Sequence, residues 1–164
     1  EKEIATVLWR YGEERASRRI AQAICTARST EPVVRTGQLA GIIAGVVRSE
    51  PGRHAATRSF QAIRIYINNE LDELEAALRA AVDALAVGGR LCVISFHSLE
   101  DRIVKRFMRD HSRVDPALRD VPVVPASALP VLKLPSRAVT AGEAELQQNP
   151  RARSAVLRTA EKLR

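Results

Sequence analysis

The stretch GGRLCVISFHSLEDRIVKRFMR, residues 88–109, decides the fold of this chain. Two glycines end a helical pattern and lead into an apolar run, residues 91–96, which predicts a strand. A His-Ser pair follows, and then the apolar spacing becomes that of an amphipathic helix with an acid in its first turn. Helix, glycine turn and strand form the second half of a β-α-β crossover. Open α/β sheets bind ligands at the carboxyl ends of such strands, so we expect a functional site near His97.

Residues 1–69 carry a helical pattern only. Apolar residues recur at helical spacing in four segments, and prolines and glycines separate them. Thr36 and Thr57 are the expected N-caps of the last two helices, because a threonine oxygen accepts a hydrogen bond from the first turn. Asn68 and Asn69 predict a break, since asparagine favours caps. The expected helices are residues 1–10, 13–27, 36–47 and 57–68.

Residues 70–164 alternate helix and strand instead. Ser98 with Asp101 resembles a capping box that opens the helix after the first strand. Five prolines between residues 110 and 141 predict a loop there. The expected elements are a helix over 70–86, the strand 91–96, a helix from Ser98 to about 109, a short strand near 131–134 or 138–140, helical turns in 142–148 and a strand over 154–159. This order is that of the closing portion of an α/β sandwich.

The composition is that of a globular protein, with 46% apolar and 27% charged residues in a chain of 164. The formal charge is +7, and arginine outnumbers lysine 22 to 4. Arginine suits phosphate recognition, but a GC-rich genome also favours arginine codons, so composition leaves both explanations open. Cys25 and Cys92 have neither zinc spacing nor a disulfide framework, so we expect free thiols in a reducing cytoplasm. We expect no signal peptide and no membrane span.

The chain resembles the ribosomal small-subunit methyltransferase H family, also called MraW, in three stretches: RSFQAIRIYINNELDELEAAL, GGRLCVISFHSLEDRIVKRFMR and NPRARSAVLR. GEERASRRIAQAI near the start fits the same pattern, so the resemblance runs along the whole chain. It implies methyl transfer from S-adenosylmethionine to the N4 amine of a decoding-site cytidine in 16S rRNA, with the small ribosomal subunit as partner. No metal is implied, and the oligomeric state stays open.

The resemblance also implies a fold. The family has a seven-stranded, Rossmann-like class I methyltransferase sheet, interrupted by a helical insertion that serves substrate recognition. Residues 1–69 correspond to the insertion, and residues 70–164 to the C-terminal part of the α/β domain. Glu1 already lies in a helical pattern, so the chain reads as a fragment whose beginning is missing.

No cofactor-binding residue can be assigned to this chain. The family's glycine-rich cofactor loop lies upstream, and no such loop occurs here: Gly41 and Gly45 fall inside a helical pattern, and Gly88-Gly89 precedes its strand. We therefore expect the cofactor site in the missing N-terminal part, and weak or no cofactor binding by these residues. The catalytic base stays unassigned.

The helix expected over residues 57–68 is a candidate RNA-binding element. Four polar residues fall within an arc of about 120° on a helical wheel: Arg58, Gln61, Arg64 and Asn68. Apolar residues of the adjoining arc are expected to anchor it: Phe60, Ile63 and Ile67. Any surface helix carries such a stripe. The family resemblance favours RNA contact.

Four residues of the second half are further candidates. His97 is placed to hydrogen-bond a base or a phosphate, or else to satisfy nearby backbone. Arg102 follows on the helix, as a phosphate contact or as part of a solvated face. Arg151 and Arg153 precede the last strand, and in an extended segment they would point the same way and grip phosphate together. A basic cluster near the start could straddle RNA or pair with neighbouring acids: Arg15, Arg18 and Arg19.

Two other functions remain open at this point. One is a catalytically silent RNA-binding module built from the basic helices. The other is a methyltransferase that acts on DNA or protein, which composition alone does not exclude. Preference for duplex DNA over ribosomal subunits at matched salt would favour the latter.

Overall fold

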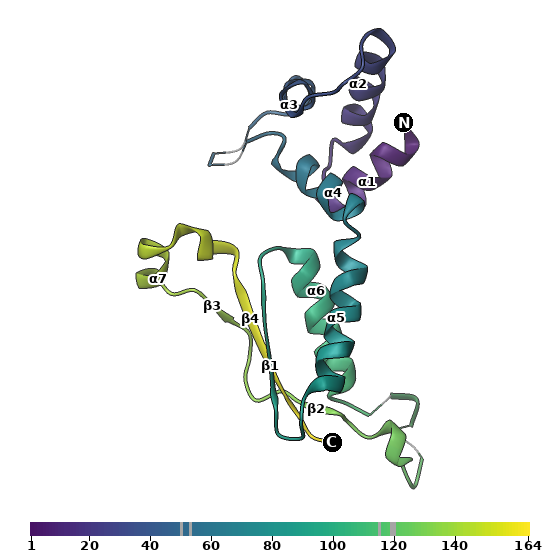
Figure 1. Ribbon diagram of the computed structural model, residues 1–164, viewed down its shortest axis with the longest axis vertical. Coiled ribbons are helices and arrows are strands. Elements are labelled where there is room, and N and C mark those ends of the chain that lie inside the picture. Colours follow the sequence, from purple (N-terminus) through teal and green to yellow (C-terminus); the bar gives the residue numbers. More distant parts are fainter. Residues whose placement is uncertain (50, 53, 115, 119–120) are drawn as a thin grey trace. The chain divides into compact units, whose positions relative to one another are not determined.

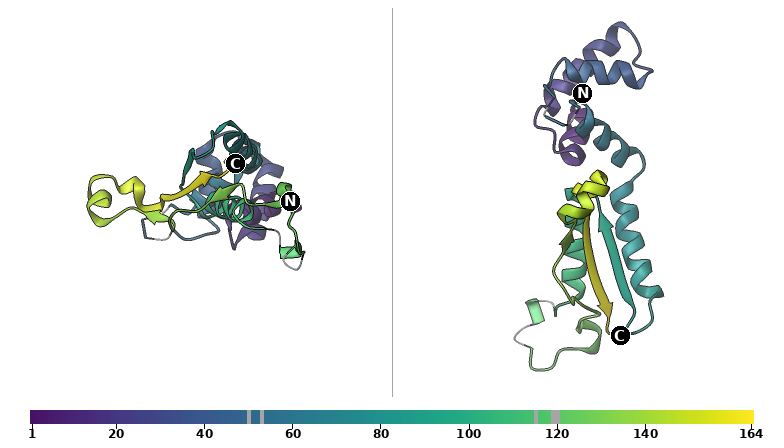
Figure 2. Two further views of the ribbon diagram at one scale, coloured as in Figure 1. Left: turned by 90° about the horizontal axis from the view of Figure 1, so that it is seen from below. Right: turned by 90° about the vertical axis from the view of Figure 1, so that its left-hand side faces the viewer.

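The structure is a computed structural model that describes residues 1–49, 51–52, 54–114, 116–118 and 121–164. It divides into two compact units, residues 1–70 and residues 71–164. Figures 1 and 2 show the first unit as helices and the second as a sheet with helices beside it. Among the described residues, no helix combines the length and the apolar character that crossing a bilayer requires.

The described part of the first unit contains the helices α1 (Lys2–Gly12), α2 (Ser17–Thr30), α3 (Thr36–Ala44) and α4 (Thr57–Ile67). Helix α1 packs against α4 and α2, and α2 packs against α3. Apolar side chains at helical spacing on all four helices build a common core, which stabilises the unit by removing apolar surface from water. The buried core residues are Val7, Leu8, Ile20, Ile24, Ile43, Ala56 and Ala62.

The turn between α1 and α2 explains why α2 begins later than the sequence predicted. Glu13 adopts a left-handed conformation with φ of 50°, which ends the helical path. The carboxylate of the buried Glu14 then accepts a hydrogen bond from the Ala16 backbone N–H at 3.0 Å. The predicted start at residue 13 is therefore wrong, and the helix runs from Ser17 to Thr30.

The expected threonine caps are wrong by one residue. Thr36 and Thr57 are the first residues of α3 and α4, and Arg35 and Ala56 occupy the N-cap positions. At the start of α3 the Gln38 side chain supplies the acceptor instead, because its Oε1 receives the Arg35 backbone N–H at 2.9 Å. The third residue of α3 thus caps the helix from within, because it accepts backbone N–H groups that precede the helix rather than one of its first turn.

The predicted break after α4 is confirmed. Asn69 has a φ of 51°, a left-handed conformation that asparagine tolerates better than most residues. Helix α5 (Glu70–Ala84) begins at the next residue.

The second unit combines α5 and further elements with a small sheet: β1 (Arg90–Ser95), α6 (Ser98–His111), β2 (Leu132–Lys133), β3 (Val139–Thr140), α7 (Glu143–Gln148) and β4 (Val156–Lys162). Short 3₁₀ helices lie at Pro116–Leu118, Ala126–Ala128 and Pro150–Ser154. Both of the short strands that were expected as alternatives form. The mixed helix-and-sheet character is confirmed.

The sheet has the order β1-β4-β2, and β3 pairs with β4 as well. Each of these pairings is antiparallel, and the register of β1 against β4 runs from Arg90–Glu161 to Ser95–Val156. Strands β1 and β2 therefore run in the same direction, with α6 between them in the chain. They are not neighbours, because the last strand inserts between them. The β-α-β crossover expected from α5 and β1 needs a strand before α5, and the described residues before α5 form helices, so this crossover stays a prediction.

Helices α5 and α6 cover one face of this sheet (Figures 1 and 2). The buried residues of this second core come from α5, α6, β2 and β4: Leu78, Val82, Val104, Met108, Leu132 and Ala160. On β1, Leu91 and Val93 pack against this core, whereas the alternate residues Cys92 and Ile94 are exposed. Alternation along a strand places neighbours on opposite faces. The second face of β1 is thus uncovered within the described residues.

The Gly88-Gly89 turn fastens α5 to β4. Gly88 has a φ of 80°, which suits glycine. The Gly88 N–H donates to the Lys162 carbonyl at 2.7 Å, and the Lys162 N–H donates to the Gly89 carbonyl at 2.8 Å. The Lys162 ammonium also donates to the carbonyls of Val82 and Leu85, at 2.8 and 2.7 Å. A cation thus binds the last free carbonyls of α5, as expected at a helix C-terminus.

Candidate functional site

The antiparallel register brings two segments that are distant in the chain to one end of the sheet. Ser95, the last residue of β1, pairs with Val156, the first residue of β4. The start of α6 follows β1 directly, and the 3₁₀ helix Pro150–Ser154 precedes β4 directly. The candidates His97, Arg102, Arg151 and Arg153 therefore belong to this end of the second unit.

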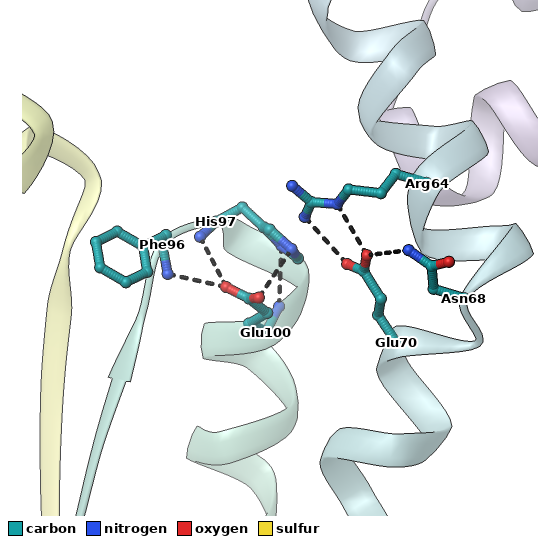
Figure 3. Close-up of polar contacts among 6 residues, drawn as sticks. All are labelled: Arg64, Asn68, Glu70, Phe96, His97 and Glu100. Carbon is teal, nitrogen blue, oxygen red and sulfur yellow. Dashed lines mark hydrogen bonds and ion pairs between the residues drawn. The ribbon is translucent and has the colours of Figure 1, made fainter.

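His97 is the N-cap of α6 (Figure 3). Its Nδ1 accepts the Glu100 backbone N–H at 3.3 Å, and its Nε2 lies 3.2 Å from Glu100 Oε1. The predicted capping box of Ser98 and Asp101 is therefore wrong, because the box begins one residue earlier, with His97 and Glu100. The His97 side chain is 13% exposed. Its predicted contact with a base or phosphate stays a prediction.

The Glu100 side chain completes the N-terminal cap of α6 by binding backbone N–H groups that precede the helix. Its Oε2 accepts the backbone N–H groups of Phe96 at 2.8 Å and His97 at 3.2 Å (Figure 3). The hydrogen bond with the His97 side chain holds the pKa of Glu100 below its usual value, and the backbone donors act in the same direction against the effect of partial burial. A helix N-terminus attracts anions, and here the protein's own carboxylate fills that position.

A bidentate ion pair joins α6 to β4. Arg158 donates from Nε and Nη2 to the two carboxylate oxygens of Asp101, at 2.7 and 2.9 Å. Both side chains are largely buried, and the bond with Asp101 raises the pKa of Arg158. The local sequence pattern predicted a capping role for Asp101. It did not indicate an ion pair with Arg158, because 57 residues separate the partners. Only the strand register shows that they meet.

Arg151 and Arg153 do not point the same way. They lie in a 3₁₀ helix, Pro150–Ser154, rather than in the extended segment that the sequence predicted. With three residues per turn, positions two apart face directions about 120° apart. Asn149 caps this turn by accepting the Arg151 N–H at 3.2 Å, and Ala152 is buried between the two arginines. Both arginines are exposed, each on its own side.

Two members of the polar stripe of α4 are bound by one carboxylate. Arg64 is bound to both carboxylate oxygens of Glu70, at 2.8 and 3.0 Å, and Asn68 donates to the same carboxylate at 3.2 Å (Figure 3). Arg58 and Gln61, the other two members, are half-buried. The stripe therefore consists of two residues held by Glu70 and two that lie closer to the core.

The expected anchor of that stripe is wrong in one position. Ile67 is 72% exposed, and the buried residues of α4 are Ser59, Ala62 and Ile65. Small residues face the core here because α1 approaches α4 at Gly12, where a Cβ atom would lie 2.7 Å from the Arg58 carbonyl oxygen. The spacing of large apolar residues predicts which helix face is buried. It fails where the buried face consists of small residues.

The basic cluster at the start of α2 is exposed, and one member is engaged within the unit. Arg19 donates from Nη2 to the Val46 carbonyl at 2.8 Å, just after the end of α3. Arg15 and Arg18 lie on the exposed surface.

The fold and these contacts define an α/β unit with a basic strand end, joined in sequence to a basic helical unit. The family model described as MraW methylase family matches residues 1–163, so the chain belongs to this family. It is 60% identical over 164 residues to "Ribosomal RNA small subunit methyltransferase H" of Xanthomonas euvesicatoria pv. vesicatoria, which covers 99% of this chain and 48% of that protein. A relative of the same name from Xylella fastidiosa (strain M12) is 57% identical over 169 residues, covering 99% of this chain and 54% of that protein.

The chain thus spans about half the length of the curated relatives it matches. The strand end does not by itself fit S-adenosylmethionine. Dinucleotide- and nucleoside-binding α/β sites use a free carboxylate for ribose hydroxyls. Here Glu100 is engaged by the backbone of α6, and Asp101 is engaged by Arg158. Among the described residues, no three potential metal-ligating side chains are gathered into a group.

Proposed function

We propose that this chain is part of a methyltransferase that transfers a methyl group from S-adenosylmethionine to the N4 amine of a cytidine in 16S rRNA. The observation that carries the proposal is family membership over residues 1–163. Over 99% of its length, this chain is 60% identical to two relatives named for small-subunit rRNA methylation. The basic composition, with a formal charge of +7, fits an RNA substrate.

We propose a division of labour between the two units. Residues 1–69 serve RNA recognition, and residues 70–164 form the closing part of a Rossmann-like class I sheet. Three features of the second unit support an incomplete sheet. Among the described strands, β1 pairs on one edge only. Its second face exposes Ile94, and on the covered face the buried hydroxyl of Ser95 has no hydrogen-bond partner among the described residues. Further strands of a longer protein would pair with that edge.

Methyl transfer to the cytosine N4 amine makes two demands on the active site. The lone pair of the cytosine N4 amine is delocalised into the ring, so the site must orient the amine and accept its proton. S-adenosylmethionine, when bound, supplies the methyl group. We assign its site to the other part of the complete protein, because the acids at the end of β1 are engaged within this chain.

RNA contact is assigned to polar side chains of both units. Arg102, Arg151 and Arg153 surround the end of β1 and are placed to bind phosphates, while Arg58, Gln61, Arg64 and Asn68 contact RNA from α4. His97 orders the start of α6 and belongs to the same group. Phosphate contacts fix position and base contacts specify sequence.

A chimera tests the substrate. The matching 164 residues of the Xanthomonas euvesicatoria relative are replaced by this chain, and the chimera is incubated with S-adenosylmethionine and unmethylated small ribosomal subunits. Nucleosides are then identified by mass spectrometry, with duplex DNA as the control substrate. We expect N4-methylated cytidine in 16S rRNA and none in DNA. Methylation of DNA instead, or of ribosomal protein, would contradict the proposal.

One specific observation favours a second candidate, an RNA-binding module without catalysis. Both carboxylates at the end of β1 are engaged, and the sequence contains no glycine-rich cofactor loop. If the chimera binds small subunits as the parent relative does but transfers no methyl group, this second function is the correct one.

A further inference from the structure

The helical unit contains a groove with an apolar floor and a polar rim. Its volume is about 650 Å³, within the range of small-ligand sites. Helices α1, α2 and α4 and the segment before α3 contribute to it. Val7, Leu8 and Ile24 form part of the floor, and the polar residues Glu3, Arg28 and Tyr66 also line it.

Tyr66 presents a flat aromatic surface at this groove. Its side chain is 49% exposed, although Tyr11 lies beside it with ring centroids 6.0 Å apart and an angle of 40° between the planes. The Tyr66 hydroxyl donates to Glu3 Oε1 at 3.3 Å. The ring is therefore fixed before any ligand arrives, which lowers the entropic cost of stacking another ring on it.

The polar groups of the groove match the edge of a nucleobase. The Glu3 carboxylate accepts hydrogen bonds, as an exocyclic amino group requires, and the exposed guanidinium of Arg28 donates to ring nitrogens, carbonyls or phosphate. Proteins recognise single-stranded RNA by stacking unpaired bases on aromatic rings and hydrogen-bonding their edges.

The charge of the helical unit as a whole also fits RNA. Residues 1–70 contain eleven Lys and Arg against seven Asp and Glu. Arg10 lies over the Tyr11 ring, 5.5 Å from its centroid, so a cation stands next to the aromatic pair. An apolar peptide would use the floor of such a groove, but it would gain nothing from this excess of positive charge.

We propose that this groove binds one unpaired nucleobase of the RNA substrate, with Tyr66 as the stacking surface. The inference rests on the proposed function, because it takes RNA as the substrate. It adds a binding site within the helical unit, and none of the residues that line it belongs to the polar stripe of α4.

Binding of fluorescently labelled single-stranded oligocytidine to the 164-residue chain tests the inference. Tyr66→Ala should weaken binding roughly tenfold, the order expected for one lost base–aromatic stack. Tyr66→Phe keeps the ring and should bind within about twofold of the unaltered chain. Trp9→Ala is the matched control, because Trp9 is 61% exposed on α1 but does not line the groove.

A second variant tests the groove by filling it instead of removing the Tyr66 ring. Val33 lines the groove from the segment before α3, and Val33→Trp should fill the groove and weaken binding without changing any charge. Circular dichroism confirms that each variant is folded. If folded Tyr66→Ala and Val33→Trp bind oligocytidine as tightly as the unaltered chain, the groove is not a nucleobase site, while the proposed function stands. If the unaltered chain binds neither oligocytidine nor small subunits, the proposed function itself fails.

Discussion

Glu100 shows how a single side chain settles the start of α6. Its carboxylate accepts two backbone N–H groups and faces the His97 ring, so the helix N-terminus carries an internal anion. In many α/β proteins the same position binds a ligand phosphate. The RNA phosphates in our account are therefore bound by the arginines around this end, and His97 with Glu100 acts by positioning the helix.

Replacing Glu100 tests this role through its pH dependence. Folding lowers the pKa of Glu100 from 4.5, so the unfolded chain binds the proton more tightly. The stabilisation is complete above pH 4.5 and is lost as the pH falls through the lower value of the folded state. Glu100→Gln should reduce the free energy of unfolding by about 1 kcal/mol at neutral pH. Urea unfolding followed by circular dichroism measures this difference.

Unfolding measurements at acidic pH provide the control for Glu100→Gln. Below the lowered pKa of the folded state the Glu100 carboxyl is protonated in both states, so the unaltered chain and Glu100→Gln should converge in stability. A difference that stays constant from neutral to strongly acidic pH would show that the Glu100 charge does not stabilise the start of α6.

At the scale of single residues, the sequence indicated which residue types lie near the end of β1. It did not indicate which side chains bind one another there. The site at the end of β1 followed from the strand-to-helix transition and from His97. Arg158 was missed because its partner is distant in the chain, and the His97 cap was missed because histidine is rarely an N-cap. The pairing of Arg151 with Arg153 failed because proline and Asn149 shape a 3₁₀ turn there.

Between elements, α1 packs closely against α4 at Gly12. Gly12→Ala would bring a Cβ atom to 2.7 Å from the Arg58 carbonyl oxygen and 3.1 Å from the Ala62 Cβ atom. The helices must then separate, and we expect a loss of about 1–3 kcal/mol in the free energy of unfolding. Fluorescence of Trp9, the single tryptophan, follows the unfolding of this unit.

Gly41 provides the matched control for that substitution. It lies inside α3, and a Cβ atom there would meet nothing within 4 Å. Gly41→Ala should therefore raise stability by roughly 0.5–1 kcal/mol, because alanine loses less conformational entropy in a helix. If both substitutions act in the same direction, the close contact at Gly12 does not limit the packing of α1 on α4.

A double-mutant cycle tests the link between α6 and β4. Asp101→Ala and Arg158→Ala remove the two partners of the largely buried bidentate pair, singly and together. We expect a coupling free energy of about 1 kcal/mol from urea unfolding, because partial burial limits solvent screening. The pair of Glu75 and Arg79 on α5 is exposed and should give only about 0.3–0.5 kcal/mol. Equal coupling in both cycles would mean that the bond does not clamp α6 to the sheet.

Most elements followed from periodicity and from glycine, proline and asparagine, because these signals are local. Helix ends were less accurate, since side chains such as Gln38 and Glu14 supply caps that no simple pattern shows. The strand order could not be predicted, because β4 inserts between two strands that precede it in the chain.

At the scale of the whole molecule, the second unit has the character of a partial sheet. Helices cover one face of it, and β1 has an unpaired edge within the described residues. The chain matches about half the length of its curated relatives. We therefore propose that these 164 residues bind RNA and contribute the closing strands of the sheet. We propose that the methyl donor binds to the other part of the protein.

Transfer of labelled methyl groups into small ribosomal subunits tests this assignment most directly. Three polypeptides are compared: this chain, the remaining part of the Xanthomonas euvesicatoria relative, and the chimera that joins them. We predict incorporation by the chimera and none above background by either part alone. Incorporation by this chain alone would contradict the account, because the methyl donor would then bind within these residues.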